Sequence, residues 1–168
     1  THGGVTQANA HPMPDESGRL AVIHNGIIEN HRVLRERLLS KGYTFRSETD
    51  TEVVVHLVAD VLGDARSADA VLAAGREEFR ELRGLDAIIL LDQGSRTLTA
   101  VKNISPLVIG RNASGVFVAS DTLALAGHVE EVMYLNDQEV AQLSCDGLRV
   151  VSAETGEPIA ERWVPIPV

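Results

Sequence analysis

Residues 24–26, with the sequence His-Asn-Gly, could stabilise a negatively charged reaction intermediate. Asn25 follows His24 and a short apolar run, so its carboxamide lies where a buried strand is expected to end. A carboxamide N–H beside the backbone N–H of Gly26 would supply two converging neutral donors, which is the composition of an oxyanion hole for acyl transfer. Glycine also lets a substrate carbonyl approach the backbone closely. Asn-Gly is equally a common signal for a β-hairpin turn, although no obvious partner strand follows Gly26.

Asp50 is the second candidate for a binding role. It ends the segment 47–50, Ser-Glu-Thr-Asp, just before a predicted helix. A carboxylate at the end of a loop could receive the ammonium group of a ligand. The same side chain could instead only stabilise the positive N-terminal end of the helix dipole. The spacing of the residues does not decide between these two roles.

Two histidines near the N-terminus lie among small or turn-forming residues, His2 in "THGG" and His11 in "NAHP". Each could line a site or be a solvated polar group. A zinc site is not expected, because these two and the other histidines of the first half lack both a zinc-motif spacing and a cysteine partner. The sequence also lacks the motifs of a serine nucleophile elbow, a phosphate-binding loop and a dinucleotide site. We therefore expect neither a metal nor a cofactor.

The composition favours a protein that acts on small ligands. With 15 basic and 24 acidic side chains the formal charge is −9, which disfavours nucleic acid or an anionic membrane as the main partner. Apolar runs such as residues 87–91 are far shorter than the roughly 20 residues that span a bilayer, and Thr1 begins no signal peptide. The single cysteine, Cys145, excludes an internal disulfide and fits a reducing compartment. We expect a cytoplasmic protein.

The elements that must position these residues begin with a short strand over 20–23 and a helix over 31–41, which Asn30 could cap. A second helix is expected in the segment "SETDTEVVVHLVADVLG", at whose start Thr49 and Glu52 have the spacing of a capping box. Both helices should bury an apolar stripe. The stripe residues are Val33, Leu34, Leu38 and Leu39 in the first helix, and Val53, Val54, Leu57, Val58, Val61 and Leu62 in the second.

The rest of the chain changes from helical to β-rich patterns. A third helix is predicted over 67–82. From Leu85 onward, short β-rich runs alternate with Gly, Asn and Ser turns, which predicts consecutive antiparallel strands. Three more strands should follow a helical turn at 122–127. Because the sequence contains no repeat or linker, we expect residues 1–168 to form one α+β domain.

Four segments together resemble one family of amidotransferases. They are "THGGVTQANAHP", "VIHNGIIENHRVLRERLLSKGYTFRSETDTEVVVHLV", "SPLVIG" and "FVASDTLAL". The chain is similar, essentially end to end, to the glutaminase domain of the glutamine–fructose-6-phosphate aminotransferases (isomerizing), also called glucosamine-6-phosphate synthases. Single segments are shared with other class II glutamine amidotransferases, and the phosphoribosyl-pyrophosphate type is the alternative. The resemblance implies the N-terminal-nucleophile (Ntn) fold, an αββα sandwich of two antiparallel sheets between helical layers.

The resemblance also implies a reaction and a set of site residues. In this family an N-terminal cysteine attacks the side-chain amide of glutamine, and hydrolysis of the thioester releases glutamate. The ammonia passes to an isomerase domain that converts fructose 6-phosphate to glucosamine 6-phosphate, and the parent protein is expected to be a homodimer. By resemblance, Asn25 and Gly26 would stabilise the oxyanion and Asp50 would bind the α-ammonium of glutamine. Thr1 and His2 would belong to a glutamine-binding loop, with His11 near the pocket.

The chain departs from the family pattern at both ends. The family's N-terminal cysteine and the Arg-Trp-Ala triplet expected before Thr1 are missing, and so is the isomerase domain after Val168. The resemblance therefore implies that residues 1–168 form a partial glutaminase domain without its N-terminal strands, helix and nucleophile. Such a chain would be inactive alone and would expose sheet edges and apolar faces, which favours self-association. Two other interpretations remain open, a non-catalytic glutamine-binding remnant and a protein that uses Thr1 as its nucleophile.

Overall fold

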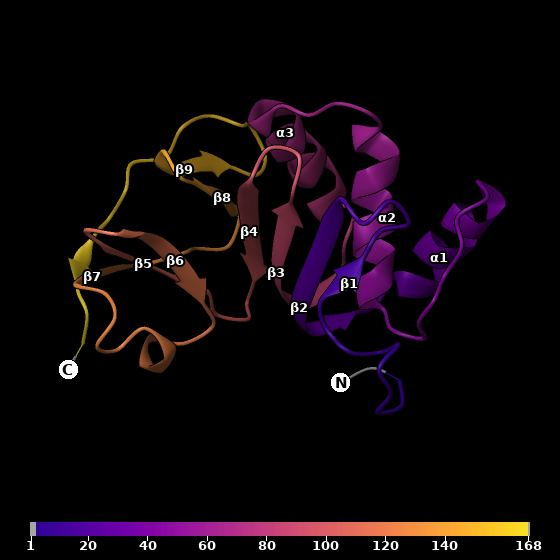
Figure 1. Cartoon of the computed structure of the whole chain (residues 1–168), viewed down its shortest axis with the longest axis horizontal. Coiled ribbons are helices and arrows are strands. Elements are labelled where there is room, and N and C mark those ends of the chain that lie inside the picture. Colours follow the sequence, from indigo (N-terminus) through magenta and orange to yellow (C-terminus); the bar gives the residue numbers. More distant parts are fainter. Residues whose placement is uncertain (1–2, 168) are drawn as a thin grey trace.

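The computed structural model of the protein describes residues 3–167, which form two antiparallel sheets and three α-helices (Figure 1). The first sheet contains, in spatial order, β1 (Met13–Pro14), β2 (Leu20–Ile28), β3 (Gly84–Asp92), β4 (Thr97–Asn103), β8 (Glu139–Ser144) and β9 (Gly147–Ser152). The second sheet contains β10 (Val164–Pro165), β7 (Glu131–Tyr134), β5 (Val108–Asn112) and β6 (Gly115–Ala119). The expected α+β fold with two antiparallel sheets is confirmed.

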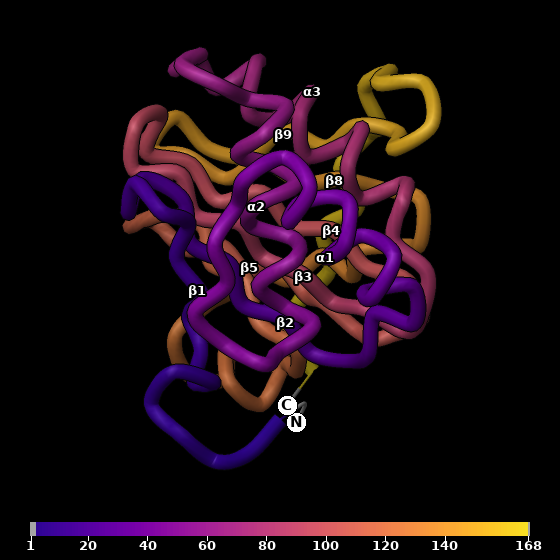
Figure 2. The backbone as a smooth tube through the Cα atoms, turned by 90° about the vertical axis from the view of Figure 1, so that its right-hand side faces the viewer, coloured from indigo at the N-terminus to yellow at the C-terminus, as the bar shows by residue number. Residues whose placement is uncertain are grey.

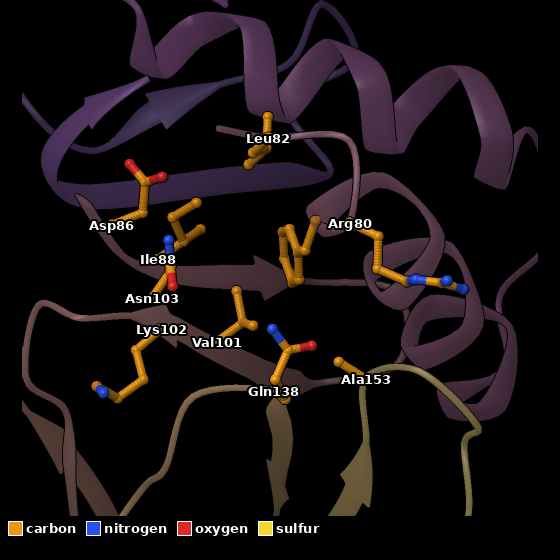
Figure 3. A pocket seen from close by; sticks show the side chains of 10 residues that line it. Arg80, Leu82, Asp86, Ile88, Val101, Lys102, Asn103, Gln138 and Ala153 are labelled. Carbon is orange, nitrogen blue, oxygen red and sulfur yellow. The ribbon is translucent and has the colours of Figure 1, made fainter. Parts of the chain in front are cut away.

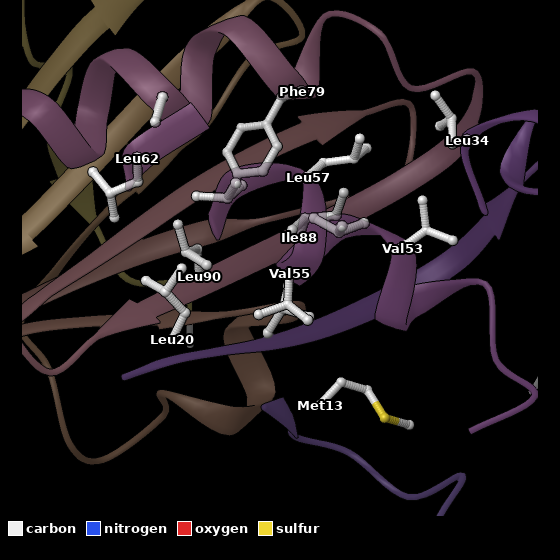
Figure 4. Close-up of a cluster of buried hydrophobic side chains, with 14 of the residues drawn as sticks. Met13, Leu20, Leu34, Val53, Val55, Leu57, Leu62, Phe79, Ile88 and Leu90 are labelled. Carbon is white, nitrogen blue, oxygen red and sulfur yellow. The ribbon is translucent and has the colours of Figure 1, made fainter. Parts of the chain in front are cut away.

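Helices cover one side of the first sheet (Figures 1 and 2). They are α1 (His31–Ser40), α2 (Thr51–Leu62) and α3 (Ala68–Phe79). The central helix, α2, packs on β2 and against both other helices. Figure 4 shows Val53, Val55 and Leu57 of this helix in one buried cluster with Ile88 and Leu90 of β3. This core fixes the start of α2 over the first sheet.

A second core lies between the two sheets. It contains Ala100 of β4, Ala141 of β8, Ile109 of β5 and Met133 of β7. On the outer face of the second sheet lie the 3-10 helix η1 (Thr122–Ala124) and the segment that follows it. β3 and β4 form one antiparallel pair and β5 and β6 another, as expected, but the two pairs belong to different sheets.

The second sheet leaves part of the first sheet uncovered. Ile27 on β2 and Leu85 on β3 point to the side opposite the helices and are 60% and 51% exposed. The outer edge of β2 is paired only at Ala21 and Val22, by the two-residue strand β1. An exposed sheet edge and an exposed apolar face are therefore present, and self-association through them stays a prediction.

The strand predicted to end at Ile23 is longer than expected. β2 continues through residues 24–26 to Ile28, and Asn25 pairs with Ala87 of β3. The prediction of a strand that is interrupted at the His-Asn-Gly segment is therefore wrong, and so is the hairpin-turn interpretation. The reason is the pairing with β3, which runs along all of β2 and joins segments far apart in the sequence.

The predicted cap and stripe of the first helix are only partly correct. The Asn30 side chain makes no capping bond to α1. Its amide donates to the carbonyl of Glu81 and its oxygen accepts the N–H of Arg83, so it joins the start of α1 to the segment after α3. Val33 and Leu39 are exposed rather than buried, because α1 lies at the outer side of the helical layer (Figure 1).

The capping box predicted from Thr49 and Glu52 is also wrong. The Glu52 carboxylate instead accepts the backbone N–H groups of Arg46 and Ser47. α2 is buried on nearly every side because it packs against the sheet and two helices, although Val61 of the predicted stripe is 41% exposed.

The predicted start of the third helix is confirmed. α3 begins at Ala68, and the Ser67 hydroxyl accepts the N–H of Ala70 at 3.1 Å, which caps the helix. The helix ends at Phe79 rather than at Leu82, because the chain turns there to enter β3.

Candidate functional site

Three segments surround a cavity of about 410 Å³ beside the open edge of β2. They are the loop that contains residues 3–11, residues 24–26 of β2, and residues 49–51 at the start of α2. The cavity therefore gathers four of the predicted site residues, namely His11, Asn25, Gly26 and Asp50. The predicted residues Thr1 and His2 lie outside the described residues.

The open edge of β2 presents backbone donors to this cavity. The N–H of Glu29 donates to the carbonyl of Arg83 at 2.7 Å, on the side of β3. The N–H of Ile28 points the other way and donates to Asp50 Oδ2 at 2.8 Å. Because backbone N–H groups alternate in direction along an antiparallel strand, the N–H of Gly26 points to the same side as that of Ile28. The Gly26 donor and the Asp50 carboxylate therefore lie along one edge.

Glycine is required at position 26 by the close approach of β3. Gly26 has a φ of +119°, and a Cβ there would collide with the carbonyl oxygen of Leu85. The opposite strand is equally tight, since a Cβ at Gly84 would collide with the carbonyl oxygen of Ile27. Because glycine has no side chain, nothing projects from β2 at position 26, and the edge of the strand stays accessible.

The side chain of Asn25 is available to a ligand. Asn25 is exposed, and among residues 3–167 its carboxamide has no hydrogen-bonding partner. Side chains alternate between the two faces of a strand, so Asn25 points away from the helical layer while His24 points into it. A neutral amide donor is thus placed next to the Gly26 N–H.

Asp50 forms a nearly fully buried acidic wall of the cavity, with only 1% of its surface exposed. Because Asp50 directly precedes α2, it lies near the positive end of the helix dipole, but its side chain makes no capping bond. The carboxylate instead accepts the N–H of Ile28. Its burial and its place in the cavity fit the binding of a cationic group.

Asn9, which sequence reasoning missed, holds the loop that carries His11. Its amide donates to the carbonyl of Gly4 at 2.9 Å, and its oxygen accepts the N–H of Glu48 at 2.9 Å. The loop of residues 3–11 is thereby attached to the segment that carries Asp50. Asparagine among small, turn-forming residues in "NAHP" was the only sequence signal for this role.

His24 is buried and connects the cavity to the core. Its Nε2 lies 2.7 Å from Asp86 Oδ1, and its Nδ1 lies 3.0 Å from Thr51 Oγ1. Thr51 Oγ1 in turn lies 3.4 Å from His11 Nε2. Partial burial and then the neighbouring His24 lower the pKa of His11, while Asp50 acts in the opposite direction. Sequence reasoning missed Thr51 and Asp86, because these contacts join segments far apart in the sequence.

Glu52 anchors the segment that precedes α2. In addition to the N–H groups of Arg46 and Ser47, it binds His56 Nε2 at 2.9 Å. Burial alone would raise the pKa of Glu52, but hydrogen bonds from His56, Ser47 and the Arg46 backbone lower it to about 2. The ionised carboxylate therefore fixes the loop that ends in Asp50.

A second cavity, of about 220 Å³, lies between the end of α3 and the first sheet (Figure 3). Three of its polar lining groups are engaged elsewhere: Lys102 pairs with Asp137, Asn103 donates to the carbonyl of Gly84, and Asp86 bonds to His24. This cavity offers no ligand-binding chemistry comparable to that at the edge of β2.

Residues 3–167 contain no group of three or more His, Cys, Asp or Glu side chains arranged to hold a metal ion. None of the helices they form is long and apolar enough to cross a bilayer. Cys145 is exposed in the turn between β8 and β9, and β3 and β4 separate these strands from β2.

The sequence model of the glutamine amidotransferase domain matches residues 4–127. The chain belongs to the glutamine amidotransferase family. The match includes every described residue that lines the cavity at the edge of β2 except Gly3.

Curated relatives of this amidotransferase chain carry the name glutamine–fructose-6-phosphate aminotransferase (isomerizing). A protein from Thermus thermophilus is 39% identical over 167 residues, which are 99% of this chain and 26% of the relative. The protein from Idiomarina loihiensis is 42% identical over 155 residues, which are 92% of this chain and 25% of the relative. The chain thus spans about a quarter of the length of these relatives.

Solved structures confirm the fold of the amidotransferase chain. Glutamine phosphoribosylpyrophosphate amidotransferase from B. subtilis has a TM-score of 0.75 and 21% identity, and the match covers 90% of this chain and 33% of that protein. A predicted glutamine amidotransferase from Pseudomonas aeruginosa has a TM-score of 0.61 and 16% identity, covering 92% of this chain and 66% of that protein.

Proposed function

We propose that the cavity at the edge of β2 binds glutamine for hydrolysis to glutamate and ammonia. The observation that carries this proposal is the arrangement of an acidic group and amide donors along one strand edge. Asp50 suits the α-ammonium of glutamine, while Gly26 and Asn25 offer donors for the side-chain carbonyl at the other end. A ligand with an ammonium at one end and an amide at the other complements this arrangement.

In this proposal Asn25 and Gly26 stabilise the tetrahedral intermediate. When a nucleophile attacks the glutamine side-chain amide, negative charge moves onto the carbonyl oxygen. The Asn25 amide and the Gly26 N–H then donate to that oxygen, and one such donor contributes about 10²–10³-fold to the rate. Collapse of the intermediate releases ammonia, and water releases glutamate from the acyl enzyme.

We assign the attacking nucleophile to a part of the protein outside residues 1–168. Cys145 is exposed in the turn between β8 and β9, and β3 and β4 separate these strands from the cavity at the edge of β2. By resemblance to the family the nucleophile is an N-terminal cysteine, so the isolated chain is expected to be inactive as a partial glutaminase domain. Thr1 is the other candidate, in the manner of other N-terminal nucleophiles.

The acceptor of the ammonia is proposed from the relatives. Because the curated relatives are named for glutamine and fructose 6-phosphate, we propose that a further domain uses the ammonia to form glucosamine 6-phosphate, in a homodimeric, cytoplasmic protein. A phosphoribosyl-pyrophosphate amidotransferase, which has a similar fold, is the second candidate. The sugar phosphate that supports glutamine-dependent amination distinguishes the two.

Glutamate release from glutamine tests the proposal. We expect activity from the protein that carries an upstream cysteine segment, and none from residues 1–168 alone. Asp50→Asn in the active protein should mainly raise KM for glutamine, because it removes the charge that faces the ammonium. Activity in the short chain would instead implicate Thr1, and glutamine binding without any hydrolysis in either form would support a non-catalytic remnant.

A further inference from the structure

Four polar side chains form a continuous hydrogen-bonded path from the core to the cavity. The path runs from Asp86 on β3 through His24 on β2 and Thr51 on α2 to His11 on the N-terminal loop. Three of these residues are buried, with 5% of Asp86, 5% of His24 and 2% of Thr51 exposed. It therefore links three separate segments at the point where the cavity forms.

The chemistry of the groups sets the direction of these hydrogen bonds. A carboxylate only accepts, so His24 Nε2 must donate to Asp86. In the neutral form of His24 the remaining Nδ1 is then an acceptor, so at basic pH the Thr51 hydroxyl donates to it at 3.0 Å. The hydroxyl proton prefers His24 to Asp50, whose Oδ1 lies 3.5 Å away.

The last step determines the state of His11. Because the Thr51 proton is directed to His24, its oxygen is left to accept from the N–H at His11 Nε2. His11 is then the Nε2–H tautomer, and its Nδ1 is an acceptor. The lowered pKa of His11 is consistent with a neutral ring, which would not repel a cation bound at Asp50.

We propose that Asp86, His24 and Thr51 are positioning residues that fix His11 as a neutral Nε2–H tautomer and thereby present an acceptor to ligand N–H groups in the cavity. Only the identity of that ligand as glutamine rests on the proposed function. The same path also connects the segments that carry Asn25 and Asp50. His24 directly precedes Asn25 in the chain, and Thr51 directly follows Asp50.

The imidazole nitrogens report the tautomers directly. In the 168-residue chain labelled with 15N-histidine, at about pH 8 where an ordinary imidazole is neutral, we expect His24 and His11 both to be protonated at Nε2 and unprotonated at Nδ1, with His11→Gln identifying the His11 signals. A His24 protonated on both nitrogens at this pH would overturn the proposal. Thr51→Ser keeps a hydroxyl and should preserve this pattern. Thr51→Val has nearly the same shape without the hydroxyl, so His11 should become a mixture of tautomers.

Glutamine affinity separates this inference from the proposed function. Thr51→Val should weaken glutamine binding about five- to tenfold, the loss expected for one hydrogen bond, and Thr51→Ser should restore it. If the chain binds no glutamine but shows the expected tautomers, only the proposed function fails. A Nδ1–H tautomer of His24, or an unchanged His11 tautomer in folded Thr51→Val, would overturn the positioning path. Should Thr51→Val fail to fold, the tautomers of the unsubstituted chain alone decide.

Discussion

The helix-covered side of the first sheet and the β-sandwich between the two sheets, called here the sandwich half, both have apolar cores. They differ in the buried polar groups that lie beside these cores. Around the start of α2 the buried groups include His24, Asp50, Thr51, Glu52 and Asp86, which are joined to other polar groups. Between the two sheets the buried cluster is made of aliphatic side chains and Met133. Because a buried polar group costs free energy unless it is hydrogen-bonded, the polar half must be fixed more tightly by specific contacts. The proposed site lies at the edge of that half.

The largest expected effect tests the close approach of β2 and β3. Gly26→Ala should lower the free energy of unfolding by about 4 kcal/mol or more, because its Cβ meets a backbone oxygen that cannot move aside. Gly147 in the sandwich half has the same φ of +119° but nothing near a Cβ. Gly147→Ala should therefore cost only about 1–2 kcal/mol of backbone strain. Urea unfolding of both variants measures the difference, and equal losses would remove the close approach as the reason for Gly26.

The next effect concerns catalysis rather than stability. In the active protein, Asn25→Ala should lower kcat for glutamine hydrolysis by roughly 10²–10³-fold with little change in thermal stability, because Asn25 is exposed and its side chain holds no other described group. Asn136→Ala, at an exposed position of the sandwich half, is the control and should leave kcat unchanged. A full rate in Asn25→Ala would exclude Asn25 as an oxyanion donor.

Glu52 provides a pH-dependent test of the polar half. Its pKa in the folded protein is about 2, below the ordinary 4.5, so its contribution to stability is present above about pH 4.5 and is lost as the pH falls toward 2. Glu52→Gln should lower the free energy of unfolding at pH 7 by about 2–3 kcal/mol and flatten this acid dependence. Glu154→Gln, an exposed change in the sandwich half, should do neither. An unchanged acid profile in Glu52→Gln would show that Glu52 does not anchor the loop before Asp50.

The smallest expected effect has the opposite sign. Burial, and then Glu81 and Glu77, raise the pKa of Glu78 on α3 to about 7, and its Oε2 is buried without a partner among the described residues. Since the folded pKa lies above the ordinary 4.5, stability should fall as the pH rises from about 4.5 to 7. Glu78→Gln should therefore raise the free energy of unfolding at pH 8 by about 1–2 kcal/mol.

Glu139 is the matched control for Glu78. It is buried in the sandwich half, but Arg162 donates to both of its carboxylate oxygens at 2.8 and 2.9 Å. Glu139→Gln should consequently destabilise the protein at pH 8. If thermal unfolding at pH 8 shows that Glu78→Gln also destabilises the protein, the charge on Glu78 does not lower stability, and the contrast with the paired carboxylate of Glu139 fails.

Local patterns predicted the elements of the chain, but not the contacts between them. The start of α3 follows from Ser67, whose capping bond spans only three residues, and the turns after Leu85 follow from Gly, Asn and Ser. The length of β2 and the role of Asn30 could not be predicted, because β3 and Arg83 lie more than fifty residues away. The His24–Asp86 contact was hidden for the same reason.

The site residues were found for two different reasons. The chemistry of Asn25, Gly26 and Asp50 marked them as candidates, and the resemblance to the family supplied their roles. That His11 shares a cavity with them follows only from the fold. Asn9 and Thr51 were missed because an ordinary loop asparagine or helix-start threonine carries no signal until its partners are known.

A titration of the 15N-labelled protein with L-glutamine, followed by NMR, tests the central claim most directly. The account predicts that backbone amide shifts change in residues 3–11, 24–28 and 49–51, and that these changes are lost in Asp50→Asn. Changes confined to the sandwich half, or no change at millimolar glutamine, would contradict a glutamine site at the edge of β2.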